Sequence, residues 1–403
     1  MPKLAFFYAT FPRPTETFVR RELKALIELG IQPEIFSIWG GEAEWQNIKI
    51  RRFCLWKLCV LIYWLPYWAW RNSTAFREIL SALWNRPCPN LQNWNETFLG
   101  LGFALVEAKR LKNEKFDLFH GVWATMPATA TFALSRLTDT PFSMGAHAYD
   151  LFRRGGDWLL IEKFKYAAFI RTSSKSSFRR LHAMGLPKEK IHLIQRGLSY
   201  WPERKSFELK KPAFIKLISV GRLVEKKGYF CLLRILQDLS QRNNCEFEMK
   251  IVGSGPLHGQ LSEEIARYGL SKKVFLLGSR REDEVRELFL EADVKLFTGI
   301  IDSKGDRDGI PNVIPEAMSA GCLILASNYA GASEAFVDRV SGYEINPRRP
   351  REWVEILEEF AKKPDYFISM RKKAQLYCKK RFDIKNTARS LHEIFLNAII
   401  TNE

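Results

Sequence analysis

A short stretch in the second half of the chain combines a turn, a helix start and two carboxylates. Asp308 and Gly309 are typical of a turn, and Asn312 is a residue that caps helices. Free backbone N–H groups in the first turn of the next helix, which includes Val313, would suit a phosphate. The carboxylates of Asp308 and Glu316 can accept hydrogen bonds from sugar or ribose hydroxyls. The stretch predicts a binding site for a nucleotide sugar, and the alternative is a polar loop before an ordinary capped helix.

Two cations follow the first strand that we predict in the same half of the chain. Arg222 comes directly after the strand 214–220, and Lys227 lies five residues later. Both can reach a diphosphate that gains negative charge as it departs, in place of a metal ion. Solvated surface is the alternative for such a pair. Because both cations leave the same edge of the sheet as the Asp308 turn, we favour the phosphate site.

A tight glycine turn, Gly253 and Gly255, follows the predicted strand 248–252. It lacks the third glycine of the dinucleotide fingerprint, so it predicts neither a nicotinamide nor a flavin cofactor. The seven cysteines are scattered without a C-x-x-C pair or a Cys/His cluster, and the acidic stretch 302–309 has no glutamate where a calcium loop needs one. We therefore expect no metal and no cofactor.

The first half of the chain offers a second group of candidate residues. His147 follows a predicted strand and can contact a sugar hydroxyl, with Asp150 three residues later. His120 ends another strand. Glu16 and Thr17 open the first helix, where they either touch substrate or simply cap that helix. For each histidine the alternative is a side chain whose hydrogen bonds are satisfied by the backbone.

Short apolar runs alternate with helical stretches along the chain, which predicts an α/β fold with parallel sheets. The pattern restarts after a linker at 195–212, so we expect one domain of residues 1–200 and a second of residues 206–382, with a final helix of about 383–403. The strands are expected at 4–9, 34–39, 116–120, 141–146, 167–172, 191–195, 214–220, 248–252, 274–277, 294–298 and 323–326.

Composition excludes several classes of protein. With 403 residues, 46% apolar and 27% charged residues, the chain is neither disordered, collagen-like nor a disulfide scaffold. The apolar run near the start is too short for a signal peptide, so we expect a cytoplasmic protein. The net charge of +17 predicts an anionic partner. No nucleic-acid recognition signature appears, so nucleic acid is not the partner we expect.

The segment 53–70 belongs to neither predicted sheet. It has one charge, no polar face and arginines at both ends, and eight of the 12 tryptophans fall between Trp39 and Trp94. Three interpretations stay open: a buried inserted helix, docking of residues 51–71 on an anionic membrane surface, and a membrane-spanning helix.

Together these motifs resemble the retaining glycosyltransferases of family 4, and the resemblance covers nearly the whole chain. Within that family the sequence is most similar to enzymes of bacterial exopolysaccharide and colanic-acid biosynthesis. The matching strings are Pro14-Thr15-Glu16-Thr17-Phe18, His147 to Asp150, Gly221-Arg222-Leu223, Lys227-Gly228 and Gly253 to Pro256. The family's pair of glutamates eight positions apart is met by Asp308 and Glu316, with aspartate one methylene shorter at the first position.

The resemblance implies the GT-B fold, with two facing Rossmann-like domains and a C-terminal helix that crosses back to the first. It also implies a nucleotide-sugar donor, no metal, and transfer with retention to a saccharide acceptor, which the basic first domain suggests is lipid-linked at the inner membrane face. The implied contacts are Arg222 and Lys227 to the diphosphate, Glu316 to the ribose, and Asp308 and His147 to the sugar. A nucleotide-sugar epimerase and a non-catalytic nucleotide-sugar-binding subunit are the alternatives.

Overall fold

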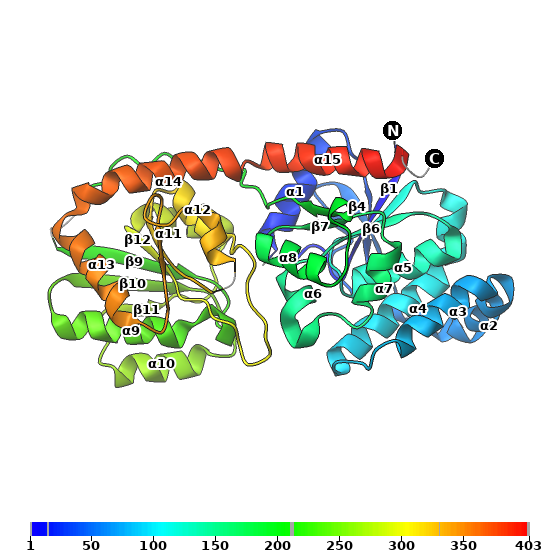
Figure 1. Ribbon diagram of the computed structural model, residues 1–403, viewed down its shortest axis with the longest axis horizontal. Coiled ribbons are helices and arrows are strands. Elements are labelled where there is room, and N and C mark those ends of the chain that lie inside the picture. The colour runs from blue at the N-terminus through cyan, green and yellow to red at the C-terminus, as the bar shows by residue number, and fades with distance from the viewer. Residues whose placement is uncertain (1, 14–15, 210–212, 330, 401–403) are drawn as a thin grey trace. The chain divides into compact units, whose positions relative to one another are not determined.

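The computed structural model describes residues 2–13, 16–209, 213–329 and 331–400. Pro14 and Thr15 of the resemblance and residues 210–212 of the expected linker lie outside the described residues. The chain divides into two compact units (Figure 1). The first contains Met1–Gly197 and Ile384–Glu403, and the second contains Leu198–Asp383.

In the described part of the first unit, eight strands form one sheet in the order β3-β4-β2-β1-β5-β6-β7-β8. Neighbouring strands are parallel except for β3 and β4, which pair antiparallel at one edge. The strands are β1 (Leu4–Tyr8), β2 (Glu34–Ser37), β3 (Glu44–Trp45), β4 (Ile48–Arg52), β5 (Leu118–Gly121), β6 (Phe142–Gly145), β7 (Ile170–Thr172) and β8 (Ile191–Leu193).

Helices cover both faces of this sheet, because alternate side chains of its central strand enter two different cores. Ala5 and Phe7 of β1 pack on one side, and Leu4, Phe6 and Tyr8 pack on the other. The helices are α1 (Thr17–Glu28), α2 (Leu61–Arg71), α3 (Ser73–Trp84), α4 (Leu91–Glu114), α5 (Met126–Thr138), α6 (Ala148–Phe152), α7 (Leu160–Tyr166), α8 (Lys175–Ala183) and α15 (Ile384–Ile400).

The second unit holds a six-stranded, fully parallel sheet in the order β11-β10-β9-β12-β13-β14. Its strands are β9 (Phe214–Val220), β10 (Glu246–Val252), β11 (Val274–Leu276), β12 (Val294–Phe297), β13 (Leu323–Ser327) and β14 (Tyr343–Ile345). Its helices are α9 (Tyr229–Arg242), α10 (His258–Arg267), α11 (Glu282–Glu291), α12 (Val313–Ser319), α13 (Pro350–Lys362) and α14 (Ile368–Arg381).

These two sheets confirm the α/β prediction and every expected strand, within a few residues at the ends. Three strands were not predicted: the hairpin β3–β4 and the edge strand β14. All three are short and carry charged or exposed residues, so they lack the apolar run that marked the other strands.

The segment 53–70 is not the buried helix that was one of its three interpretations. It forms a 3₁₀ helix, η1 (Leu55–Val60), followed by all of α2 except its last residue, and within it only Phe53 and Trp68 are buried. The Trp68 indole N–H donates to the Leu105 carbonyl at 2.8 Å, which fixes α2 on α4. No helix among the described residues is both long and apolar enough to cross a membrane.

Candidate functional site

Two loops at the carboxyl edge of the second sheet lie backbone against backbone. The loop after β9 donates from Gly221 N to Val252 O and from Leu223 N to Ser254 O, both at 2.9 Å. Gly253 has φ of +139°, and a Cβ there would lie 2.0 Å from the Gly221 carbonyl oxygen. Only glycine permits this approach, so the glycine turn serves to position the loop that carries Arg222 and Lys227.

Lys227 ends the short 3₁₀ helix η4 (Glu225–Lys227) and is held close to the sheet. The next residue, Gly228, has φ of +68°, and a Cβ there would lie 1.9 Å from the Thr298 carbonyl oxygen. Glycine at this position therefore lets η4 sit directly on the end of β12. As a result the Lys227 ammonium lies 5.4 Å from the centre of the Phe297 ring, facing the loop after that strand.

Asp308 in that loop is the direct partner of Lys227. Its Oδ2 lies 2.7 Å from Lys227 Nζ, and its Oδ1 lies 3.6 Å from Lys226 Nζ. Burial alone would raise the pKa of Asp308, but the two ammonium groups outweigh it and hold that pKa below its ordinary value. The carboxylate is therefore ionised, and Lys227 is held in place before any substrate arrives.

A second ion pair holds the same loop in place. Lys226 Nζ lies 3.0 Å from Asp306 Oδ2, and both side chains are about nine-tenths buried. The Ile300 N–H also donates to the Lys226 carbonyl at 2.9 Å. Adjacent lysines thus have separate tasks, because Lys226 fixes the loop while Lys227 faces Asp308.

The helix after this loop differs in one detail from the prediction. Asn312 occupies the position before α12, but its side chain makes no cap hydrogen bond, so the predicted side-chain cap is wrong. Its backbone is already helical, with φ of −56° and ψ of −29°, which is not the extended geometry that a capping side chain needs. Pro315 and Glu316 lie in the first turn, and Gly321 follows the helix with φ of +75°.

A buried lysine beneath this site was not predicted. Lys295 lies on β12 with a fully buried side chain, and its Nζ has no hydrogen-bond partner among the described residues. Burial, and then the charge of Lys227, lower the pKa of Lys295 to about 7, against a raising effect of Glu316. A lysine inside an otherwise apolar strand was the sequence signal that could have revealed it.

In the first unit, His147 is a buried, neutral histidine at the end of β6. Its Nδ1 lies 3.3 Å from Ser173 Oγ, and its ring meets the Trp123 ring edge-on at 5.4 Å between centroids. Burial, and then the charges of Arg196 and Arg171, lower the pKa of His147 well below its ordinary value. Its Nε2 has no hydrogen-bond partner in the described part of the chain.

Asp150, the candidate residue three positions after His147, is held by backbone groups. Its Oδ2 accepts hydrogen bonds from the backbone N–H groups of His147 at 3.3 Å and Ala124 at 3.2 Å, and the side chain is buried. Burial raises the pKa of Asp150 to about 7 in spite of these two hydrogen bonds. Asp150 therefore ties two loops together and positions His147.

Glu16 and Thr17 lie at the start of α1, half-buried beside Trp123. Glu16 precedes the helix but makes no side-chain cap hydrogen bond, which is against the capping alternative for this residue. Its carboxylate lies 3.7 Å from an Arg13 guanidinium nitrogen. Burial raises the pKa of Glu16, while Arg13 and Arg196 lower it by a smaller amount.

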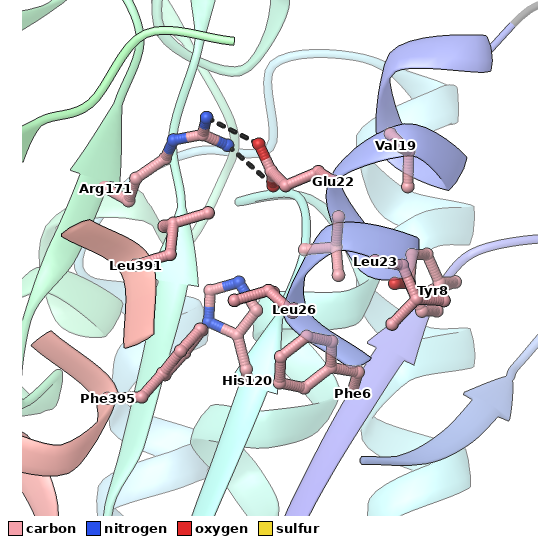
Figure 2. Close-up of a pocket in the computed structure, with 11 residues that line it drawn as sticks. Phe6, Tyr8, Val19, Glu22, Leu23, Leu26, His120, Arg171, Leu391 and Phe395 are labelled. Carbon is pink, nitrogen blue, oxygen red and sulfur yellow. Dashed lines mark hydrogen bonds and ion pairs between the residues drawn. The ribbon is translucent and has the colours of Figure 1, made fainter. Parts of the chain in front are cut away.

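His120 requires a correction, because it is enclosed and does not lie on an open edge. It lines a cavity of about 20 Å³ beneath α1 and α15, room for one water molecule (Figure 2). Its Nδ1 lies 2.9 Å from Ser143 Oγ, and its ring packs against Phe6 and Phe395. Burial, and then Arg171, lower the pKa of His120 to about 3, so it is a neutral core residue.

Comparison with known proteins finds one family whose model matches part of the chain. The family described as glycosyl transferases group 1 matches residues 202–381, which hold the Lys227–Asp308 pair and α12. The chain is also 26% identical to the amylovoran biosynthesis glycosyltransferase AmsK of Erwinia amylovora over 360 residues, 85% of this chain and 86% of that protein. It is 26% identical to the colanic acid biosynthesis glycosyltransferase WcaL of Escherichia coli over 394 residues, 89% and 90% of the two chains.

Solved structures extend the likeness over both units of this glycosyltransferase. Anabaena Alr3699/HepE, in complex with UDP and glucose, is 16% identical, with a TM-score of 0.70 over 98% of this chain and 100% of that one. Sucrose-phosphate synthase from Thermosynechococcus elongatus is 12% identical, with a TM-score of 0.74 over 100% of both chains. At such identities the likeness shows the fold alone, and that fold is GT-B.

The predicted residues of the glycosyltransferase therefore fall into distinct positions. Lys227 and Asp308 are in direct contact, and Arg222 lies exposed on the same loop as Lys227. Gly309, Asn312, Val313 and Glu316 follow Asp308 along the chain into α12. Among the described residues, no group of three or more His, Cys, Asp or Glu side chains could hold a metal ion.

Proposed function

We propose that this glycosyltransferase transfers a sugar, with retention at the anomeric carbon, from a nucleotide-sugar donor to a saccharide acceptor in cell-surface polysaccharide synthesis. The observation that carries the proposal is the Lys227–Asp308 pair, a preorganised cation beside a carboxylate at the carboxyl edge of the group 1 domain. The names of AmsK and WcaL support the pathway, and the UDP and glucose bound to HepE support a nucleotide-sugar donor.

In the proposed reaction, Lys227 and Arg222 bind the diphosphate and stabilise the charge that develops as it leaves. The bond between the anomeric carbon and the phosphate oxygen breaks, and the acceptor oxygen bonds to that carbon on the same face. The acceptor proton passes to the departing phosphate oxygen. Glu316 holds the ribose, and Asp308 holds the sugar. The Lys227 ammonium and the Arg222 guanidinium supply the positive charge, so we propose that transfer needs no metal ion.

One series of measurements tests this proposal and its two alternatives. Nucleotide sugars are first screened for thermal stabilisation of the full-length protein, which binding to the native state produces. The best donor is then incubated with saccharide acceptors, and NMR of the product reports the anomeric configuration. We expect acceptor-dependent transfer with retention, undiminished by EDTA. A changed sugar without any acceptor would support the epimerase, donor binding without turnover would support the binding subunit, and an inverted product would contradict retention.

We further propose that the acceptor is lipid-linked and that the helices after β4 dock on the inner face of the membrane. Large apolar side chains are exposed along η1, α2 and α3, among them Trp56 at 70%, Trp70 at 81% and Trp84 at 87%. Exposed arginines accompany them at positions 52, 71 and 77. Aromatic rings beside cations suit the headgroup region of an anionic bilayer.

Point variants test the docking better than deletion, because Phe53 and Trp68 belong to the core. Each aromatic ring removed from the interface should cost about 1.5–3 kcal/mol of binding. We expect the combined Trp56→Ser, Trp70→Ser and Trp84→Ser variant to lose most of its co-sedimentation with vesicles of phosphatidylglycerol and phosphatidylcholine. Trp39→Ser, which removes a tryptophan that is 52% exposed outside these helices, is the control. Equal binding by the triple variant and the control would disprove the docking surface.

A further inference from the structure

Arg196 is a cation held by aromatic rings and by no carboxylate. It follows β8 in the first unit, and its guanidinium carbon lies 3.8 Å from the centre of the Phe18 ring and 5.0 Å from the centre of the Trp123 ring. Within the described residues its guanidinium makes no hydrogen bond and no ion pair. Five N–H donors in a planar fork are thus available beside two aromatic surfaces.

The carboxylates whose charges act on Arg196 have contacts with other groups. Glu22 binds Arg171 through both oxygens, at 3.1 and 2.8 Å (Figure 2). Glu16 lies beside Arg13, and Asp150 accepts from backbone N–H groups. Burial, and then the neighbouring charge of Arg171, lower the pKa of Arg196 to about 9. Arg196 is therefore a partly buried cation, and Glu22, Glu16 and Asp150 act on its charge without an ion pair to its guanidinium.

A second polar group without a hydrogen-bond partner, on His147, lies beside Trp123. The Trp123 ring contacts Phe18, at 6.1 Å between centroids, and His147, at 5.4 Å. The Nε2 of His147 is buried and has no hydrogen-bond partner among the described residues. Because that histidine is neutral, Nε2 can donate or accept. Trp123 thus brings together an unpaired guanidinium and an unpaired imidazole nitrogen, both of which a ligand could satisfy.

We infer that Arg196, with Trp123 beneath it, forms a subsite for an oxyanion carried by the acceptor, either a carboxylate or a phosphate. A guanidinium fork matches both groups through two parallel hydrogen bonds, and a poorly hydrated site strengthens them. The inference rests on the proposed function, since it assigns the acceptor to the first unit. It explains why Arg196 is stacked and not ion-paired: the aromatic rings fix the plane of the fork while leaving its N–H groups for the ligand.

The test uses the full chain saturated with the nucleoside diphosphate that stabilises it most, so that the cations of the group 1 domain are occupied. Two matched pairs of probes are titrated by calorimetry: glucuronate against glucose, and dimethylallyl diphosphate against dimethylallyl alcohol. We expect the anionic member of at least one pair to bind more tightly. Preference for glucuronate alone assigns an acidic sugar, and preference for the diphosphate alone assigns a lipid-carrier diphosphate.

Variants of Arg196 show whether that preference arises at this subsite. Arg196→Gln should weaken the preferred anion about 10- to 100-fold, the range for hydrogen bonds to charged groups, and Arg196→Lys should retain part of the affinity. Arg267→Gln is the matched control, because Arg267 also lies over an aromatic ring, 5.3 Å from the centre of Tyr268, on the exposed helix α10. An unchanged preference in Arg196→Gln, or no preference in the wild type, overturns the subsite. Stabilisation by the nucleoside diphosphate, measured first, reports separately on the donor site.

Discussion

Lys227 and Asp308 illustrate how single residues were partly predictable. The sequence placed both at the same edge of the sheet, but it did not predict that their side chains bond to each other, because 80 residues separate the two motifs. The aspartate, which is shorter than the glutamate of the family pattern, bonds directly to the lysine at 2.7 Å. Asp308 therefore acts on Lys227 in addition to any contact with the sugar.

A double-mutant cycle tests whether the two residues act together. Lys227→Ala should lower kcat about 10²- to 10³-fold, as loss of one preorganised cation does. If Asp308 acts partly by holding Lys227, Asp308→Asn should lower kcat further by much less in the Lys227→Ala background than in the wild type. Lys304→Ala, an exposed lysine of the same loop region, is the control. Strictly additive losses would show that Asp308 works independently of Lys227.

Lys295 predicts a pH-dependent stability. Its pKa is about 7 in the folded chain and close to 10.5 when unfolded, so between these values the unfolded state binds more protons and stability rises with pH. Lys295→Met removes this titration. The variant should be more stable than the wild type at pH 7, and the difference should shrink by up to about 1.4 kcal/mol per pH unit toward pH 10. Urea unfolding at several pH values measures it, and a difference independent of pH would contradict a depressed pKa.

At the scale of elements, apolar strands and the glycine turns between them could be predicted, and polar edges could not. The strand 214–220 was predicted to the residue, whereas β3, β4 and β14 lack an apolar run. The enclosure of His120 depends on α15, which comes from the far end of the chain, so no local pattern revealed it. The exposed face of η1 and α2 could not be predicted either. An apolar composition does not show which side chains pack against a neighbour and which stay exposed.

We predict opposite effects on stability for two glycine substitutions, one inside the contact between the loops after β9 and β10 and one outside it. Gly253→Ala should destabilise the protein by about 1–3 kcal/mol, because its Cβ would meet the Gly221 carbonyl oxygen and its φ is unfavourable for alanine. Gly259→Ala, in the first turn of α10 with open space around it, should stabilise by up to about 1 kcal/mol. Chemical denaturation of both variants measures the two signs. A neutral Gly253→Ala would mean that the loops are free to separate.

At the scale of the whole molecule, each unit has its own sheet with helices on both faces, and the candidate residues gather at the ends of strands in both. The second unit carries the group 1 family match, and the relatives of similar length align over both units. The first unit carries Arg196 and His147 around Trp123, together with the aromatic face of η1, α2 and α3. We propose that the second unit binds the donor and the first unit binds the acceptor.

The central claim is that the group 1 domain binds an activated sugar through Lys227 and passes it to an acceptor. The most direct measurement is the rate of acceptor-dependent sugar transfer by the wild type, Lys227→Ala and Lys304→Ala, each checked for native thermal unfolding. The account predicts transfer by the wild type and by Lys304→Ala, and a loss of about 10²- to 10³-fold in Lys227→Ala. Transfer at the wild-type rate by a folded Lys227→Ala protein would contradict it.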